Sequence, residues 1–191
     1  MGYFSASPKP LYLGPFIIKP LYLKKYTLIA FLAAFSWFPT RAQITIHRSY
    51  ALYVQSFARY SSWPPLTGDF KIVVLGETPA FDELQKSFEG KVFAGAKGRV
   101  TRATDIAGIS ADACIIYLAD EKSNLLSDLV KYTEGKPILI ITERERLHLE
   151  GADISFTMVD NRLRYDLNLK DIQKRNLKTA MQVVTLAHET L

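Results

Sequence analysis

The stretch FARYSSWPPLTGDFKIVVLG, residues 57–76, leads into the first predicted core strand of this chain. It joins an aromatic-rich segment to a double proline, a polar turn, and a β-branched run that ends on a glycine. The run FKIVVLG (70–76) is apolar with little alternation, which is typical of a strand buried on both faces of a parallel sheet. We therefore expect the preceding residues to lead the chain into the core of an α/β domain.

The residues before the double proline have the spacing of an amphipathic helix. Their apolar positions lie three or four residues apart and describe one helical face: Ile46, Tyr50, Tyr53, Val54, Phe57 and Tyr60. Pro64 and Pro65 end the helix and turn the chain toward the sheet. We predict that Trp63 is an apolar plug beneath this corner, with a ligand-stacking residue as the alternative. As a buried plug, Trp63→Ala would cost ~3–5 kcal/mol of stability.

The rest of the chain alternates strand and helix signals. Further buried strands are predicted at 99–103, 113–119 and 137–143, with helices from Pro79 to Gly90 and at 123–135, the second capped by Ser123. Residues 154–167 alternate and predict an antiparallel hairpin that turns at Asp160 and Asn161, and helix signals from Asp171 to Glu189 break near Asn176. The predicted fold is a three-layer α/β/α sandwich with a mostly parallel sheet, a C-terminal antiparallel hairpin and a terminal helix.

Residues 1–42 have the pattern of a leader with a signal peptide. Lys24 and Lys25 precede the 13-residue apolar run YTLIAFLAAFSWF, and small residues at Thr40 and Ala42 predict cleavage before Gln43. An uncleaved membrane anchor is the alternative, but the run is short for a bilayer of ~30 Å. We therefore expect an exported protein with no stable membrane span after cleavage and a single domain over residues 43–191.

The net charge of +5 belongs to this leader. Five of the 24 Lys and Arg residues, and none of the 19 Asp and Glu residues, lie in residues 1–42, which leaves 19 against 19 in the rest. A neutral domain offers no general attraction to nucleic acid, and none is predicted as a partner. Cys114 is the only cysteine, so an internal disulfide is excluded. Its apolar surroundings favour a buried hydrophobe over a reactive thiol.

Motifs for catalysis or metal binding are not recognisable. The histidines are His47, His148 and His188, and no serine lies in a G-x-S-x-G elbow. The segment HLEGAD (148–153) fits no metal-ligand spacing and predicts a solvated connection, as does ERER (143–146). The sequence therefore predicts no catalytic residue, no metal site and no cofactor.

One position resembles a ligand site. Gly76 lies between a strand and a helix start, where a doubly wound sheet can hold an anion. Gly76 lacks the further glycines of a nucleotide loop, so a tight turn is the alternative. Tyr60 and Trp63 can flank such a crevice. The predicted ligand- or partner-binding residues are Tyr60, Trp63, Gly76 and Glu77.

Several landmarks follow one another in an order that resembles a known family. They are YVQSFARYSSWPP, KIVVLG, GKVFAGAKGRVTRA, DACIIYLAD, GKPILIITE and GADISFTMVDNRLRYDLNL, followed by helix signals. This series is similar to the YfiR-like family over about residues 45–188. The resemblance implies a periplasmic, non-enzymatic regulator. The best-understood type holds an inner-membrane diguanylate cyclase inactive, so that its loss raises cyclic-di-GMP and promotes biofilm formation.

The resemblance implies that the partner is the periplasmic part of an inner-membrane diguanylate cyclase or histidine kinase. A homodimer is also compatible with the sequence. The alternative function is a periplasmic small-molecule receptor, or a minor enzyme, that uses the crevice after Gly76. A purely structural envelope protein is a third possibility.

The sequence also departs from the family pattern. Cys114 matches a cysteine common in the family, but the strand that often carries its partner has valine at 73 and 74, so redox control by a disulfide cannot be carried over. Asn161 replaces a glycine at the hairpin turn, which the turn geometry permits. The residues at the family's recurring positions are expected to be mostly fold-making: Trp63, Pro64, Gly76, Phe156 and Asn168.

Overall fold

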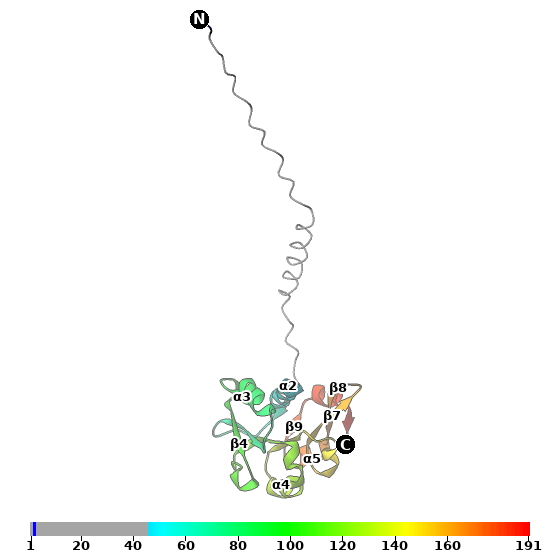
Figure 1. The fold of residues 1–191 in the computed structure, drawn as a ribbon. Helices are drawn as coiled ribbons and strands as arrows, with labels where there is room; N and C mark the ends of the chain where they lie inside the picture. The colour runs from blue at the N-terminus through cyan, green and yellow to red at the C-terminus, as the bar shows by residue number, and fades with distance from the viewer. Residues whose placement is uncertain (1, 3–45) are drawn as a thin grey trace. The chain divides into compact units, whose positions relative to one another are not determined.

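Five parallel strands form the centre of the fold. The computed structural model describes residue 2 and residues 46–191 (Figure 1). The main sheet has the order β10-β8-β7-β6-β5-β2-β4-β3. Its strands are β2 (Phe70–Leu75), β3 (Val92–Phe93), β4 (Ala96–Ala103), β5 (Ala113–Leu118), β6 (Leu139–Thr142), β7 (Ile154–Val159), β8 (Arg162–Leu167) and β10 (Glu189–Thr190). Strands β4, β2, β5, β6 and β7 run parallel, β7 and β8 form an antiparallel hairpin, and β10 pairs parallel to β8.

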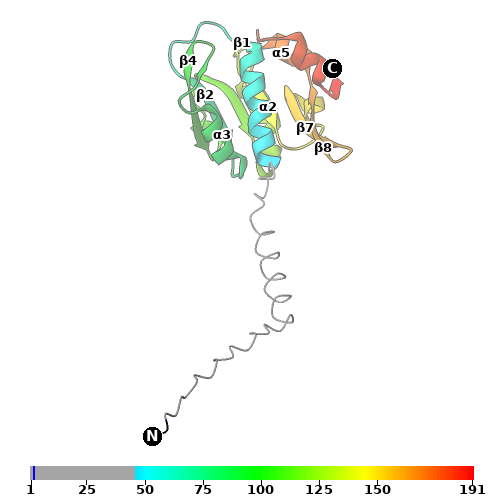
Figure 2. The ribbon, with the colours of Figure 1, turned by 90° about the horizontal axis from the view of Figure 1, so that it is seen from above.

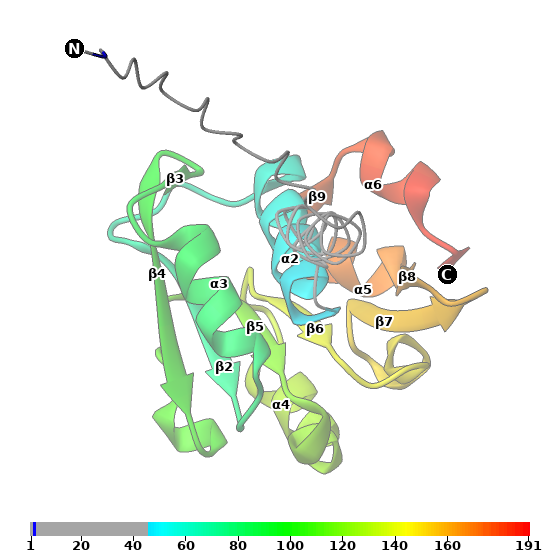
Figure 3. The same cartoon turned by 45° about the horizontal axis from the view of Figure 1, so that its top comes forward.

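The helices cover both faces of this sheet. They are α2 (Ile46–Tyr60), α3 (Ala80–Phe88), α4 (Leu126–Tyr132), α5 (Leu169–Lys174) and α6 (Met181–Leu186), with short 3₁₀ turns η1 (Ile106–Gly108), η2 (Asp120–Leu125) and η3 (Leu147–Glu150). Figures 2 and 3 show α2 and α3 side by side across one face. Side chains of α5 and α6 join the core on that face, whereas α4 packs on the other.

The alternation of side chains along the central strands explains the two cores. Ile72 and Val74 of β2 point to the face covered by α2 and α3, and Val73 and Leu75 point to the face covered by α4. All four are buried, as expected of a strand between two helical layers. The predicted α/β fold with a mostly parallel sheet and an antiparallel hairpin is therefore confirmed.

The hairpin turn follows the sequence prediction. Asp160 and Asn161 have φ of 49° and 58°, the left-handed conformation that a two-residue hairpin requires. Asn176, where the helix signals break, also has a positive φ of 59°.

Three local predictions needed correction. The first helix ends at Tyr60, before the prolines, because Ser61–Ser62 forms β1 and pairs antiparallel with β9 (Lys178–Thr179). Ser123 does not cap the next helix, since its hydroxyl donates to Asp120 O within η2. The last segment contains α5, β9, α6 and β10 in place of one interrupted helix.

The segment HLEGAD is also different from its prediction as a solvated connection. Asp153 is fully buried and accepts hydrogen bonds from Ile140 N at 2.6 Å and from Arg175 Nε at 3.1 Å. Arg175 is buried as well, and it donates through Nη1 to Thr133 Oγ1 at 2.5 Å. The ion pair of Asp153 with Arg175 joins the end of α5 to the start of β7.

The predicted leader, residues 1–42, and its cleavage before Gln43 lie outside the described residues. Within residues 46–191, no helix combines the length and the apolar character that crossing a membrane requires.

Candidate functional site

The four predicted binding residues lie at opposite ends of the central strands. We call the side on which the parallel strands begin the amino edge and the side on which they end the carboxyl edge. Trp63 packs against Phe70, which begins β2, whereas Gly76 and Glu77 follow the other end of the same strand. Tyr60 ends α2 and is half-exposed. Tyr60 and Trp63 therefore do not flank the crevice after Gly76, because the whole length of β2 separates the two pairs.

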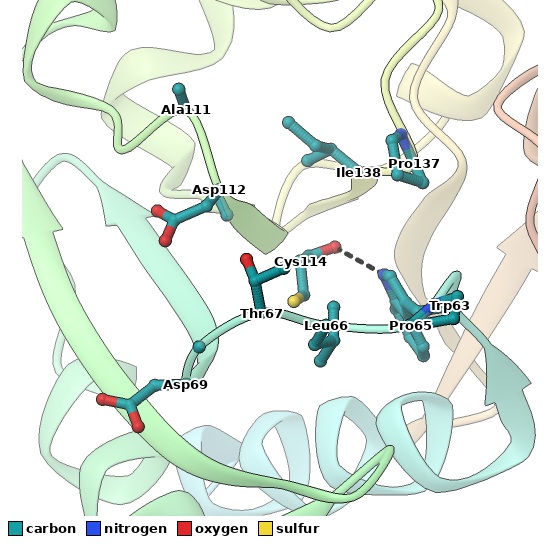
Figure 4. A pocket seen from close by; sticks show the side chains of 12 residues that line it. Trp63, Pro65, Leu66, Thr67, Asp69, Ala111, Asp112, Cys114, Pro137 and Ile138 are labelled. Atoms are coloured by element: carbon teal, nitrogen blue, oxygen red, sulfur yellow. Dashed lines mark hydrogen bonds between the residues drawn. The ribbon is translucent and has the colours of Figure 1, made fainter.

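At the amino edge, Trp63 borders a small cavity that opens between the loop before β2 and the starts of β5 and β6 (Figure 4). Its indole meets the Phe70 ring edge to face, with 4.9 Å between the centroids. The indole N–H donates to the carbonyl oxygen of Cys114 at 3.2 Å. Trp63 is partly buried, and its polar end is bonded within the fold, so the ring joins the double-proline loop to β5.

Cys114 lies beneath this cavity at an irregularity in the sheet. Lys71 pairs with Ala113 and Ile72 pairs with Ile115, so Cys114 is the extra residue of a bulge in β5. Burial raises the pKa of its thiol to about 11. The thiol is therefore protonated at neutral pH and is a poor nucleophile, in agreement with its predicted role as a buried hydrophobe.

The size of this cavity limits what it can bind. Its volume is about 130 Å³, whereas sites for drug-sized ligands and cofactors are typically ~300–1,000 Å³. The cavity has room for a few waters or a very small ligand, and a nucleotide would need the double-proline loop to move.

Replacing Trp63 tests whether it is a packing residue. Because Trp63 is only partly buried, we expect Trp63→Ala to lower the free energy of unfolding by about 2–4 kcal/mol, below the full cost of a buried tryptophan. Trp63→Phe keeps the ring contact but loses the hydrogen bond, so its free energy of unfolding should fall by only about 1 kcal/mol. Urea denaturation of both variants, with Tyr60→Ala as the exposed neighbour expected to change stability by ~0.5 kcal/mol or less, measures this. A fully stable Trp63→Ala protein that has lost only partner or ligand binding would contradict the packing role.

At the carboxyl edge, Gly76 is required by the backbone. Its φ is +101°, and a Cβ at this position would lie 2.6 Å from Lys122 Cγ and 3.1 Å from Ala119 Cβ. Other residues would be strained here. The turn that follows β2 therefore needs glycine because η2 packs directly against it.

The polar groups beside this turn are satisfied by the side chain of Glu143. One oxygen of its carboxylate, Oε1, accepts hydrogen bonds from Thr78 Oγ1 at 2.5 Å and from Tyr117 OH at 3.0 Å. The other oxygen accepts from Asp120 N at 3.0 Å. Directly after Gly76, the backbone N–H of Glu77 donates to Glu121 Oε1 at 2.8 Å. Carboxylates of the chain itself therefore accept hydrogen bonds at the carboxyl ends of the strands, where a doubly wound sheet can hold an anion, which favours a structural role for this edge.

Glu77 and Tyr60 are accessible at their separate edges. Glu77 accepts a hydrogen bond from Arg102 Nη1 at 2.6 Å on the surface, a pair that contributes little to stability because it is solvated. Tyr60 has 51% of its surface exposed. These two side chains are available for contacts with another molecule.

One group of side chains of the types that bind metal ions lies elsewhere in the described part of the chain. His148, Asp166 and Glu189 come from η3, β8 and β10 and bring their ligand atoms within 4.8 Å of one another. The sequence predicts no metal site because these residues have no motif spacing. Only the pairing of β10 beside β8 reveals the group.

Comparisons with known proteins identify the family. A search of curated proteins finds no match. The family model described as YfiR/HmsC-like matches residues 47–188, well over half of the chain and nearly the whole folded part that the structure describes. The recurring positions Trp63, Gly76 and Phe156 all lie within this match. The chain belongs to the YfiR/HmsC-like family.

Proposed function

We propose that this protein is an exported, periplasmic binding protein that inhibits an inner-membrane signalling protein such as a diguanylate cyclase or a sensor kinase. The observation that carries the proposal is the family match over residues 47–188. The YfiR/HmsC-like family is one of periplasmic regulators of cyclic-di-GMP signalling. The partner, the inhibitory direction and the export of this chain are the proposed steps.

The chemistry of the candidate site supports binding over catalysis. The Cys114 thiol is protonated. The Glu143 carboxylate accepts three hydrogen bonds from groups of the fold itself. Within residues 46–191, neither group is accompanied by a recognisable catalytic partner, so we assign recognition to exposed side chains.

Tyr60 is the residue that we propose for the partner contact at the amino edge. It is a half-exposed aromatic side chain on the last residue of α2. Aromatic residues of this kind are enriched in protein interfaces. Glu77 offers a charged contact at the opposite edge, where Arg102 is its present partner.

Deleting the gene tests the proposed regulation. If the protein inhibits a diguanylate cyclase, cellular cyclic-di-GMP should rise several-fold in the deletion strain and return to its original level with the wild-type gene. Complementation with Tyr60→Ser should restore inhibition only in part, because the variant loses interface area without losing core packing. Val92→Ser serves as a matched control, since Val92 is exposed on β3 at an edge of the sheet, and should restore inhibition fully.

Periplasmic cross-linking supplies the physical counterpart of this experiment. The wild-type protein should be recovered with one membrane signalling protein, and the yield should fall for Tyr60→Ser but not for Val92→Ser. Unchanged cyclic-di-GMP and kinase output in the deletion strain, together with no cross-linked membrane partner, would contradict the proposal. A fall in cyclic-di-GMP in the deletion strain would show that the protein activates the cyclase and does not inhibit it.

A small-ligand receptor is the second candidate, favoured by the partly buried Trp63 beside an open cavity. A thermal-shift screen against amino acids and other small compounds tests it, because a ligand that binds only the folded state raises the melting temperature. Failure of every compound to raise it by more than about 1 °C would leave this candidate without support.

A further inference from the structure

Three ionisable side chains from distant parts of the sequence meet beside the last strand of the sheet. His148 comes from η3, Asp166 from β8 and Glu189 from β10. Glu189 is paired directly beside Asp166 in the parallel register of β10 and β8. One ligand atom from each residue lies within 4.8 Å of the other two.

His148 is the unusual member of this cluster. Only 1% of its surface is exposed, and neither ring nitrogen has a hydrogen-bond partner among residues 46–191. Nδ1 lies 3.9 Å from Asp166 Oδ2, and Nε2 lies 3.9 Å from Glu189 Oε2. These separations are too long for hydrogen bonds. A buried polar group without a partner is costly, so the geometry calls for something between the imidazole and the carboxylates.

The backbone of His148 is held firmly in place. Its N–H donates to Ser155 Oγ at 2.6 Å, and its carbonyl oxygen accepts from Asn168 Nδ2 at 2.9 Å. Ser155 and Asn168 are both buried. The imidazole is therefore presented to the carboxylates by a rigid polar framework, in the way that ligands of metal sites are oriented by surrounding hydrogen bonds.

The two carboxylate oxygens of Asp166 face two different histidines. Its Oδ1 lies 2.9 Å from His188 Nδ1, while Oδ2 is the oxygen nearest to His148 in the cluster. A carboxylate that is held by a histidine through one oxygen can use the other oxygen as a metal ligand. Glu189 is about half-exposed, with 50% of its side chain accessible, so its carboxylate can move and leaves a route from solvent.

We propose that His148, Asp166 and Glu189 form a binding site for a divalent transition-metal ion of the zinc class. Such ions bind imidazole nitrogen and carboxylate oxygen at about 2.0–2.2 Å in a tetrahedral arrangement, which places ligand atoms roughly 3.3–3.6 Å apart. Nδ1 of His148 faces Asp166 and Nε2 faces Glu189, so a single ion can use only one of the two 3.9 Å separations. The three ligand atoms lie within 4.8 Å of one another. With the ion at Nδ1, the half-exposed Glu189 carboxylate would have to move closer by about 1 Å. An imidazole ligand favours Zn²⁺ over Mg²⁺ and Ca²⁺, which prefer oxygen alone.

The proposed ion would fasten β10 to the hairpin and to η3. In the present fold, β10 pairs with β8 over Glu189 and Thr190 only, so a shared ion would add a strong connection between three segments. This site is distinct from the residues proposed for the partner contact and does not depend on the proposed regulation.

Zinc titration of the purified protein tests the proposal. The protein is purified without chelators, in the form in which cells accumulate it. Bound metal is then removed with EDTA, and the protein is titrated with ZnCl₂ by isothermal titration calorimetry. We expect one equivalent of Zn²⁺ to bind, and the melting temperature to rise by about 3 °C or more at saturation. Millimolar Mg²⁺ or Ca²⁺ should not displace it.

Matched variants show whether binding occurs at this cluster. Glu189→Gln should weaken Zn²⁺ binding at least tenfold, while Glu150→Gln, which removes an exposed carboxylate of η3 outside the cluster, should leave it unchanged. His148→Gln should abolish stoichiometric binding. If His148→Gln does not fold, as judged by circular dichroism, Glu189→Gln decides the question because its side chain is half-exposed.

Two results would overturn the proposal. One is the absence of stoichiometric Zn²⁺ binding to the wild-type protein. The other is equal affinity in the Glu189→Gln and Glu150→Gln variants, which would assign the bound Zn²⁺ to other acidic groups on the surface.

Discussion

Replacing Arg175 with alanine should lower the free energy of unfolding by about 3–5 kcal/mol, the usual cost of removing one partner of a buried ion pair. Arg175 is buried and donates from Nε to Asp153 Oδ1 at 3.1 Å and from Nη1 to Thr133 Oγ1 at 2.5 Å. Without the guanidinium, the carboxyl group of Asp153 would remain in the core with one backbone donor, Ile140 N. Urea denaturation at pH 8 measures the loss.

The double variant Asp153→Asn/Arg175→Met separates the charge from the packing. It should be more stable than Arg175→Ala, because it removes both charges and leaves no uncompensated carboxylate in the core. Lys174→Met is the control, since Lys174 pairs with Asp171 on the surface, where such pairs contribute about 0.3–0.5 kcal/mol. If Lys174→Met and Arg175→Ala lowered the free energy of unfolding equally, the buried pair would contribute no more to stability than the surface pair.

The same pair predicts a pH dependence of stability. Burial raises the pKa of Asp153 to about 7, because desolvation outweighs the attraction of Arg175. The folded protein then keeps a proton that the unfolded chain releases above a pH of about 4. The stabilisation by this proton is complete below that pH and is lost as the pH rises to about 7. Wild-type stability, compared with that of Asp153→Asn, should fall across this interval, and parallel pH profiles would contradict the assignment.

Phe156→Ala should have an effect of similar size, with a loss of about 3–5 kcal/mol. Phe156 on β7 is 1% exposed, and its ring lies 4.6 Å from that of Tyr50 and 5.9 Å from that of Tyr53, between centroids. Truncation leaves a cavity where α2 packs on the hairpin, because several aromatic rings share this space. Thermal and urea denaturation both report the change.

Two further variants make the Phe156 result specific. Phe156→Leu keeps most of the apolar volume and should cost less than about 1.5 kcal/mol. Met158→Ala lies on the same strand with an exposed side chain, and its stability should stay within ~0.5 kcal/mol of the wild type. A Phe156→Ala protein as stable as Met158→Ala would mean that α2 is not held by this aromatic cluster.

Local patterns in the sequence predicted much of the fold. The spacing of apolar residues placed the first helix, and the runs at 70–76 and 113–119 predicted buried strands, since a strand between two helical layers has no polar face. The hairpin turn at Asp160 and Asn161 was also predictable, because these residues tolerate the left-handed conformation. Each of these features depends on neighbours in the chain.

The pairing of short segments was not predictable in the same way. Ser61–Ser62 and Lys178–Thr179 form β1 and β9 only because they meet across more than 100 residues of sequence. A segment of two residues is too short to show the alternation that predicts a strand. For the same reason, the first helix ends at Tyr60 and not at the prolines.

The candidate sites show the same division. The apolar run around Cys114 predicted a buried hydrophobe, because such a run is a local signal. The position of Gly76 between a strand and a helix start left a ligand site and a tight turn as alternatives. The positions of Trp63 and Gly76 at opposite ends of β2, and the meeting of His148 with Asp166 and Glu189, became visible only in the folded chain. Sheet order and register bring side chains from distant segments together. They depend on the packing of the whole core and therefore leave no characteristic spacing in the sequence.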